Sequence, residues 1–311
     1  MVIMNNNDLN LNIDLCGIKL KNPIITASGT FGFGREANEL YSISEIGAIA
    51  VKGLTLLPRM GNDTLRVAET PMGMLNSVGL QNPGVDAFLR TELPFLKQNN
   101  CVVIANIAGN TQEDYVQMAE KISDSETDLI EMNISCPNVN HGGLAFGTDE
   151  KTVYEIVRAV KTCSSKPIIV KLTPNVTDIT SIAKACENGG ADAISLINTL
   201  LGMRIDVNTR KPILERVMGG LSGPAVKPVA VRMVWQVRSV TNLPIIGMGG
   251  ISSGNDAVEF MLAGANAVAI GTATLINPYA PIKILNEIKD YLISNKVSDV
   301  KTLTNGIILN K

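Results

Sequence analysis

Histidine and closely spaced cysteines are what this sequence of 311 residues most clearly lacks. Its single histidine, His141, excludes any metal site or catalytic scheme that needs two imidazoles. The number of cysteines is odd and no two have Cys-x-x-Cys spacing: they are Cys16, Cys101, Cys136, Cys163 and Cys186. We therefore expect neither a disulfide framework nor a local zinc or iron–sulfur site, and we predict no metal on this chain. Free thiols fit a reducing compartment.

Basic charge, aromatic side chains and long apolar runs are also scarce. The 27 Lys and Arg residues are outnumbered by 29 Asp and Glu, and aromatic residues make up 4% of the chain. This balance argues against a nucleic-acid partner. No run approaches the roughly 20 apolar residues of a membrane span. The start, MVIMNNNDLNLNIDL, lacks the charged and apolar regions of a secretory signal. We therefore expect a cytoplasmic protein with no membrane partner.

What the sequence does contain is an alternation of short apolar runs with helix-length segments. Hydrophobic residues make up 45% of the chain, enough for a large core. Apolar, β-branched runs predict eight strands, at residues 23–26, 48–52, 102–106, 129–133, 168–172, 193–197, 244–247 and 267–270. Amphipathic segments predict helices at residues 113–122, 150–163, 178–188, 229–240 and 255–263. Eight such units predict an α/β fold, a closed (β/α)8 TIM barrel with a parallel sheet.

Two long insertions interrupt this alternation. Residues 53–94 follow the second predicted strand and residues 200–228 follow the sixth, and both are rich in Gly and Pro. Insertions of this length usually serve as lids or binding loops, and both leave the strand ends where barrel enzymes place their sites. Nothing in the composition divides the chain. We therefore predict one domain over residues 1–311, with long loops after strands 2 and 6.

Polar residues and glycines follow the predicted strands. They are Ser28-Gly29, Lys52-Gly53, Asn106, Asn133, Lys171, Asn198-Thr199, Gly249-Gly250 and Gly271-Thr272. In a barrel they would meet at one mouth, which would hold two lysines, several amides and few carboxylates. Such a cavity suits an anionic, hydrogen-bonding ligand better than a divalent cation. The glycines after the last two strands predict a phosphate site, with tight turns that bind no ligand as the alternative.

Two kinds of side chain at these positions could carry chemistry. Lys52 and Lys171 each end an apolar strand, where a lysine neutralises a phosphate, stabilises negative charge on a ring or forms a structural ion pair. Cys136 lies in the run Asn133-Ile-Ser-Cys-Pro-Asn138. A thiol there could transfer a proton or act as a nucleophile, or it could be an inert small residue. His141 could pair with it or be a solvated side chain.

At these residues the sequence resembles the dihydroorotate dehydrogenases, flavin enzymes of pyrimidine biosynthesis built on a (β/α)8 barrel. The resemblance extends from Leu20-Lys-Asn-Pro23 to Gly271-Thr-Ala273. Its most specific segments are Asn76-Ser-Val-Gly-Leu-Gln-Asn-Pro83, Asn133-Ile-Ser-Cys-Pro-Asn138 and Ile197-Asn-Thr199. It implies that the chain oxidises (S)-dihydroorotate to orotate in UMP synthesis, with hydride passing from C6 to FMN.

The resemblance also implies which residues form the site. FMN would be bound by Ser28, Lys52, Gly53, Asn106, Asn133, Lys171, Ile197, Gly223, Gly249, Gly250, Gly271 and Thr272, with its phosphate among the last five. Dihydroorotate would be bound by Lys52, Asn76, Ser77, Val78, Gly79, Leu80, Asn133, Asn198 and Thr199. Cys136 would be the catalytic base for the C5 proton, which requires a deprotonated thiol and activity that rises with pH. Lys171 would be the second catalytic residue, stabilising negative charge on the reduced flavin.

The type of enzyme follows from the same resemblance. A cysteine base marks the soluble class 1 enzymes, whereas the membrane-associated class 2 uses serine. The segments Val51-Lys-Gly-Leu-Thr55, Ala68-Glu-Thr-Pro71 and Leu80-Gln-Asn-Pro-Gly84 resemble the NAD-linked 1B type. Its electrons would leave through a ferredoxin-reductase-like subunit with FAD and a [2Fe–2S] cluster, and NAD+ would be the terminal acceptor. The family suggests a heterotetramer with a homodimer of this chain at its core.

Three alternatives remain open from the sequence. A stand-alone class 1A enzyme would pass its electrons to fumarate. A related flavin barrel would act on another pyrimidine, although a tRNA-modifying form would be expected to have a basic surface and an RNA-binding domain, which are absent. A non-redox, phosphate-binding barrel, such as a sugar-phosphate isomerase or a binding subunit, would lack the absorption spectrum of a flavin.

Overall fold

The computed structural model describes residues 8–135 and 146–309. Within them, eight parallel strands close into a barrel in the order β3-β4-β7-β8-β9-β10-β15-β16. The strands are β3 (Ile24–Thr26), β4 (Ala48–Ala50), β7 (Val103–Ile107), β8 (Leu129–Asn133), β9 (Ile168–Lys171), β10 (Ala193–Leu196), β15 (Ile245–Met248) and β16 (Ala267–Ile270). Each predicted strand coincides with one of them to within one or two residues at its ends. The predicted barrel is therefore confirmed.

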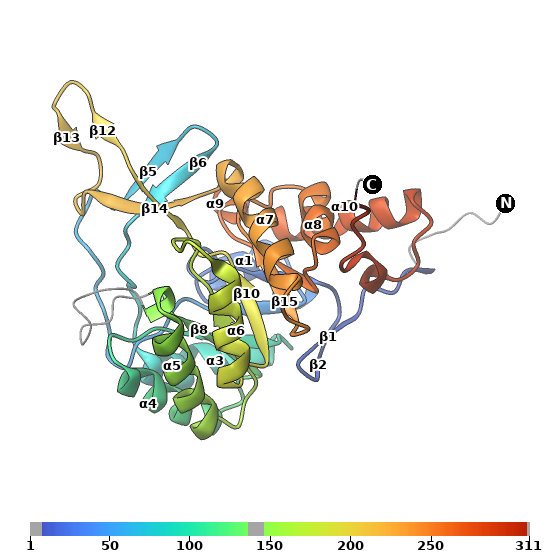
Figure 1. The fold of residues 1–311 in the computed structure, drawn as a ribbon, viewed down its shortest axis with the longest axis horizontal. Helices are drawn as coiled ribbons and strands as arrows, with labels where there is room; N and C mark the ends of the chain where they lie inside the picture. The colour runs from blue at the N-terminus through green and yellow to red at the C-terminus, as the bar shows by residue number, and fades with distance from the viewer. Residues whose placement is uncertain (1–7, 136–145, 310–311) are drawn as a thin grey trace.

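Helices surround the barrel (Figure 1). The longer ones are α4 (Gln112–Ser123), α5 (Glu150–Cys163), α6 (Ile179–Gly189), α7 (Lys227–Arg238), α8 (Gly254–Leu262) and α10 (Ala280–Ser294). Shorter ones are α1 (Arg35–Asn38), α2 (Val85–Ala87), α3 (Leu93–Gln98) and α9 (Ala273–Ile276), with single turns at Ile43–Glu45, Phe88–Glu92, Phe146–Thr148, Pro224–Val226 and Val300–Leu303. The prediction misses α10, although Ile284, Ile288 and Leu292 repeat at helical spacing and are buried. No helix in the described residues is both long and apolar enough to cross a bilayer.

The strands are apolar because the barrel sheet is buried on both faces, by the helices outside and by side chains inside. Every residue of β9, β10, β15 and β16 is buried. Helix α5 contributes Val153, Ile156, Val157 and Val160 from one face to this core. The predicted start of α4 is also confirmed, since Thr111 caps the helix and Asp114 completes a capping box with it.

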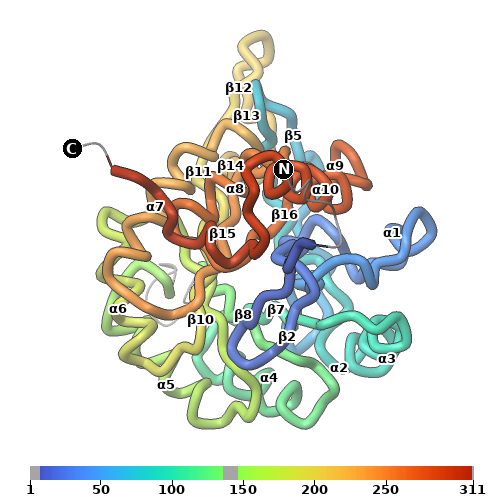
Figure 2. Tube along the Cα trace, turned by 90° about the vertical axis from the view of Figure 1, so that its right-hand side faces the viewer, coloured from blue at the N-terminus to red at the C-terminus, as the bar shows by residue number. Residues whose placement is uncertain are grey.

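A hairpin precedes the barrel and packs against its amino-terminal end. It consists of β1 (Ile13–Leu15) and β2 (Ile18–Leu20), joined by a turn in which Gly17 has a φ of +85°. Leu15 and Leu20 are fully buried. Cys16 Sγ donates to the carbonyl oxygen of Asp192, 3.4 Å away, just before β10 begins. Figure 2 shows the hairpin in blue across the side of the molecule that faces the viewer.

The two insertions meet in a four-stranded antiparallel sheet outside the barrel. Its order is β11 (Leu200–Met203), β14 (Met218–Ser222), β6 (Gly73–Asn76) and β5 (Val67–Thr70). The second insertion pairs with the first through β14 and β6, with Leu221 opposite Leu75. A smaller hairpin of β12 (Ile205–Asp206) and β13 (Lys211–Pro212) projects from it at the upper left of Figure 1. Much of what the sequence presents as two long loops is therefore one sheet.

Candidate active site

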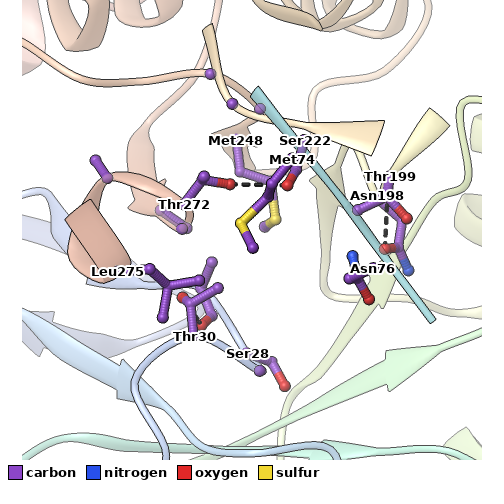
Figure 3. A pocket seen from close by; sticks show the side chains of 18 of the residues that line it. Ser28, Thr30, Met74, Asn76, Asn198, Thr199, Ser222, Met248, Thr272 and Leu275 are labelled. Atoms are coloured by element: carbon purple, nitrogen blue, oxygen red, sulfur yellow. Dashed lines mark hydrogen bonds between the residues drawn. The ribbon is translucent and has the colours of Figure 1, made fainter. Parts of the chain in front are cut away.

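A cavity of about 560 Å³ opens at the carboxyl ends of the barrel strands. Strands β6 and β14 of the four-stranded sheet line its other side with Met74, Asn76 and Ser222 (Figure 3). The cavity brings together every predicted ligand-binding residue: Ser28, Lys52, Gly53, Asn76, Ser77, Val78, Gly79, Leu80, Asn106, Asn133, Lys171, Ile197, Asn198, Thr199, Gly223, Gly249, Gly250, Gly271 and Thr272. Cys136 and His141 lie outside the described residues.

One end of the cavity is lined by side-chain amides. Asn198 Nδ2 donates to Asn133 Oδ1 at 3.0 Å, and Asn198 Oδ1 accepts from the backbone N–H of Thr199 at 2.8 Å. Asn76 Nδ2 donates to the carbonyl oxygen of Gly220 at 3.2 Å. Figure 3 shows Asn76, Asn198 and Thr199 together on one side of the cavity. Amides held in this way offer both donors and acceptors to a planar polar ligand.

Two lysines, the half-buried Lys52 and the buried Lys171, add positive charge to this end. Burial lowers the pKa of Lys52, and the positive charge of Arg66 lowers it further. Lys171 is only 6% exposed, and its Nζ lies 3.9 Å from Oε2 of Glu131. This distance is too long for a hydrogen bond. The site therefore contains two cations next to a set of neutral hydrogen-bonding groups, as an anionic ligand requires.

The opposite end is formed mainly by backbone. Gly223, Gly249 and Gly250 have φ angles of +98°, +121° and +88°, which L side chains rarely adopt. A Cβ atom on Gly250 would lie 2.8 Å from the carbonyl oxygen of Gly223. Close by, Thr272 Oγ1 and Ser222 Oγ are joined by a hydrogen bond of 2.9 Å (Figure 3). Glycine loops of this kind let a phosphate approach backbone N–H groups closely.

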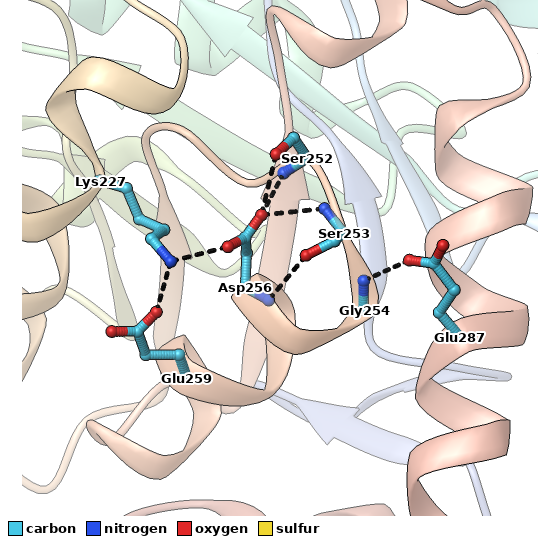
Figure 4. Close-up of polar contacts among 7 residues, drawn as sticks. All are labelled: Lys227, Ser252, Ser253, Gly254, Asp256, Glu259 and Glu287. Carbon is cyan, nitrogen blue, oxygen red and sulfur yellow. Dashed lines mark hydrogen bonds and ion pairs between the residues drawn. The ribbon is translucent and has the colours of Figure 1, made fainter. Parts of the chain in front are cut away.

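A polar network fixes the loop that follows β15 (Figure 4). Asp256 Oδ2 accepts from the backbone N–H groups of Ser252 and Ser253, each at 2.9 Å. Lys227 Nζ donates to Asp256 and to Glu259, at 2.7 Å in both cases. Burial alone would raise the pKa of Asp256, but the hydrogen bonds from Lys227, Ser252 and Ser253 outweigh it and lower the pKa to about 2. This loop therefore has a fixed conformation next to the glycine end of the cavity.

Comparison with known proteins agrees with this geometry. The family model described as dihydroorotate dehydrogenase matches residues 10–292, a span that includes all eight barrel strands. The chain belongs to the dihydroorotate dehydrogenase family. The resemblance inferred from the sequence motifs is thus confirmed.

Several relatives in the family are similar over almost their whole length, and the three described here are each named dihydroorotate dehydrogenase B (NAD(+)), catalytic subunit. The protein of Alkaliphilus metalliredigens is 56% identical over 299 residues, which cover 96% of this chain and 99% of the relative. That of Geobacter metallireducens is 54% identical over 298 residues, or 96% and 98% of the two chains. That of Thermoanaerobacter pseudethanolicus is 53% identical over 299 residues, or 96% and 99%.

Sequence reasoning about this member of the dihydroorotate dehydrogenase family misses part of the cavity. Met74, Met248 and Leu275 form apolar walls (Figure 3), and nothing in the sequence distinguishes them from core residues. Ser222 could have been found, because it precedes Gly223-Pro224 just before a helix. Glu131, which does not line the cavity but contacts Asn106 and Lys171 at its wall, is the clearest omission. It is the single charged residue of the predicted strand Leu-Ile-Glu-Met-Asn. A charge buried in a strand is costly unless partners compensate it, so its presence there indicates a specific role.

Proposed function

We propose that this chain oxidises (S)-dihydroorotate to orotate with bound FMN, in de novo pyrimidine synthesis, as the catalytic subunit of an NAD-linked enzyme. Substrate and acceptor are those named for its relatives. One observation on the chain itself carries the proposal. A single cavity gathers all the described residues of the two predicted groups, one for flavin and one for substrate.

The residues present fit FMN. Two buried polar atoms at the cavity, Asn106 Oδ1 and Ser77 Oγ, have no hydrogen-bond partner among the described residues. A ligand with N–H groups would supply what these atoms lack. A Cβ atom on Gly53 would lie 3.0 Å from Asn106 Oδ1, so this glycine leaves room for a flat ligand. Lys52, Gly53, Asn106 and Lys171 would hold the ring, and the glycine end would hold the phosphate.

Different residues of the chain would perform different parts of the reaction. Bound FMN supplies the two-electron acceptor for the hydride that leaves C6 of dihydroorotate. Cys136 removes the C5 proton as a thiolate, and because an ordinary thiol has a pKa of about 8.5, the rate rises with pH. Lys171 places a fixed positive charge where negative charge develops. Asn76, Asn133 and Asn198 bind the polar groups of the substrate and orient it.

A partner subunit would take the electrons onward. The relatives are named catalytic subunits, which implies a separate second subunit. We assign it FAD and a [2Fe–2S] cluster, with NAD+ as terminal acceptor, in a cytoplasmic heterotetramer that has a homodimer of this chain at its core. In support, no three His, Cys, Asp or Glu side chains gather as a metal site in residues 8–135 and 146–309.

The test is a comparison of electron acceptors. The purified chain should show a flavin spectrum, and dihydroorotate should bleach it without oxygen. Rapid NAD+ reduction should appear only after a purified FAD/[2Fe–2S] reductase subunit from the same genome is added. A chain without flavin would contradict the proposed function. Rapid turnover of the isolated chain with fumarate would instead favour the class 1A alternative.

A further inference from the structure

A buried carboxylate lies behind the cavity and has no role in the function proposed above. Glu131 is in the middle of β8 and is 2% exposed. On the neighbouring strands, Asn106 of β7 is opposite Glu131, and Lys171 of β9 is opposite Ser195 of β10. Asn106 and Lys171 line the cavity, whereas Glu131 and Ser195 do not. Four adjacent strands thus place polar side chains at one point in the barrel interior.

The carboxylate of Glu131 contacts all three of these residues. Oε1 accepts a hydrogen bond from Ser195 Oγ at 2.7 Å. Oε2 accepts from Asn106 Nδ2, and it also lies 3.9 Å from Lys171 Nζ. A buried carboxylate is costly to desolvate, and these partners offset that cost.

The contact with Asn106 determines which way its amide faces. An ionised carboxylate only accepts hydrogen bonds, so the amide must turn its Nδ2 donor toward Glu131. Its Oδ1 is then turned away from Glu131, and this buried atom has no partner in the part of the chain that the structure describes. A flipped amide would place two acceptors against each other. Glu131 therefore makes Asn106 a fixed acceptor for a ligand donor.

The contact with Lys171 is an ion pair without a hydrogen bond. Lys171 Nζ is 3.9 Å from the carboxylate, and within the described residues it donates no hydrogen bond to another group. Glu131 therefore accepts no hydrogen bond from the ammonium of Lys171, and the N–H groups can donate to a ligand. The negative charge still weakens the positive field of Lys171 in the cavity, because the pair lies in a region of low dielectric constant.

We propose that Glu131 is a positioning residue for the flavin site. It holds Asn106 as a hydrogen-bond acceptor toward the cavity, and it sets how strongly the Lys171 charge acts there. This inference rests on the proposed function, because it takes the ligand above Asn106 and Lys171 to be FMN. A purely structural ion pair would need neither the fixed amide nor an ammonium that, among residues 8–135 and 146–309, donates no hydrogen bond.

Two substitutions separate the two roles. Glu131→Gln keeps the shape but removes the charge, and its one amide oxygen can still accept from Asn106 Nδ2 while its Nε2 donates to the hydroxyl of Ser195. It should bind FMN as the wild type does while the midpoint potential of the flavin moves to a more positive value, since Lys171 is no longer balanced. Glu131→Asp keeps the charge but is one methylene shorter, so it should release Asn106. FMN should then bind about tenfold more weakly, as expected for one lost hydrogen bond, with a smaller change in potential.

The measurements are FMN affinity of the apoprotein by fluorescence and the midpoint potential by redox titration. Ser195→Ala is the matched control, because it removes one hydrogen bond to the same carboxylate but keeps the charge of Glu131 and its contacts with Asn106 and Lys171. It should leave the potential unchanged. Glu131→Gln is isosteric, so its potential decides the role of the charge even if the aspartate variant does not fold. Wild-type values in both Glu131 variants would overturn the inference. A wild-type chain that binds no FMN would contradict the proposed function instead.

Discussion

The two ends of the cavity are built by different means. One end presents functional groups on side chains, with the amides of Asn133 and Asn198 and the ammonium groups of Lys52 and Lys171. The other end presents backbone, where Gly223, Gly249 and Gly250 bring two loops into close approach. Figure 3 shows representatives of both ends on opposite sides of the same space.

Because the two ends of the cavity are built differently, substitutions at each end should have different effects on the protein. At the side-chain end, removing a group leaves the surrounding strands in place, so the chemistry is lost while the fold is kept. At the backbone end, adding a single carbon atom forces loops apart, so ligand affinity and stability are lost together. Substitutions at the side-chain end should therefore impair mainly catalysis, whereas substitutions at the backbone end should impair ligand binding and stability.

The largest effect should come from Cys136→Ala. Loss of the base should slow flavin reduction by dihydroorotate about 10²- to 10⁴-fold, while FMN and orotate still bind. Anaerobic stopped-flow at several pH values measures it, and the rise of the rate with pH should disappear in the variant. Cys163→Ala is the control, because this half-buried thiol of α5 lies away from the cavity. A variant as fast as the wild type would exclude Cys136 as the base.

Lys171→Met should have the next largest effect. Removing a fixed charge from a water-poor site should slow flavin reduction by about 10²-fold, and it should also weaken FMN binding because Lys171 is one of the residues proposed to hold the ring. The control is Lys161→Met, which removes a lysine paired with Asp192 at 2.6 Å outside the cavity. Stopped-flow reduction rates of the two variants decide the matter. Equal rates would show that the charge of Lys171 has no electrostatic role.

Gly250→Ala tests the backbone end. The new Cβ would meet the carbonyl oxygen of Gly223 and Cβ of Lys227, both at 2.8 Å, with φ at +88°. We expect a loss of about 2 kcal/mol in the free energy of unfolding, together with weaker FMN binding. Gly17→Ala has a similar φ of +85° but nothing within 4 Å of its Cβ, so it should cost about 1 kcal/mol and leave FMN binding unchanged. Equal effects of the two changes would mean that close approach does not matter at Gly250.

The sequence predicts the barrel well because its signal is local. Each strand is a continuous apolar run, and the helices between them repeat at helical spacing. The residues that end the strands follow directly from this reading. For this reason the sequence alone predicts that Lys52, Asn106 and Lys171 share one cavity, as they do in the structure.

The sheet over the cavity and the interior network were not predictable in the same way. Strand β14 pairs with β6, so Gly220 is opposite Asn76, more than a hundred residues earlier in the chain. Both strands are short and contain glycine, so neither shows a strong strand pattern. The role of Glu131 depends on the register of four neighbouring strands, which no single segment encodes.

The smallest effect we predict is a pH dependence of the free energy of unfolding, and it arises from the polar network next to the glycine end of the cavity. The folded pKa of Asp256 is about 2, below its ordinary value of 3.8, so its ionised form stabilises the fold above about pH 4. This contribution is lost as the pH falls toward 2. Its size should be about 1 kcal/mol between pH 5 and pH 3, because the side chain is only 14% exposed and weakly screened. Urea unfolding at the two pH values measures it, and Asp256→Asn should flatten the dependence by that amount. An unchanged dependence would mean that Lys227 and the backbone N–H groups do not hold the loop through the charge of Asp256, and the backbone end would then be fixed by its glycines alone.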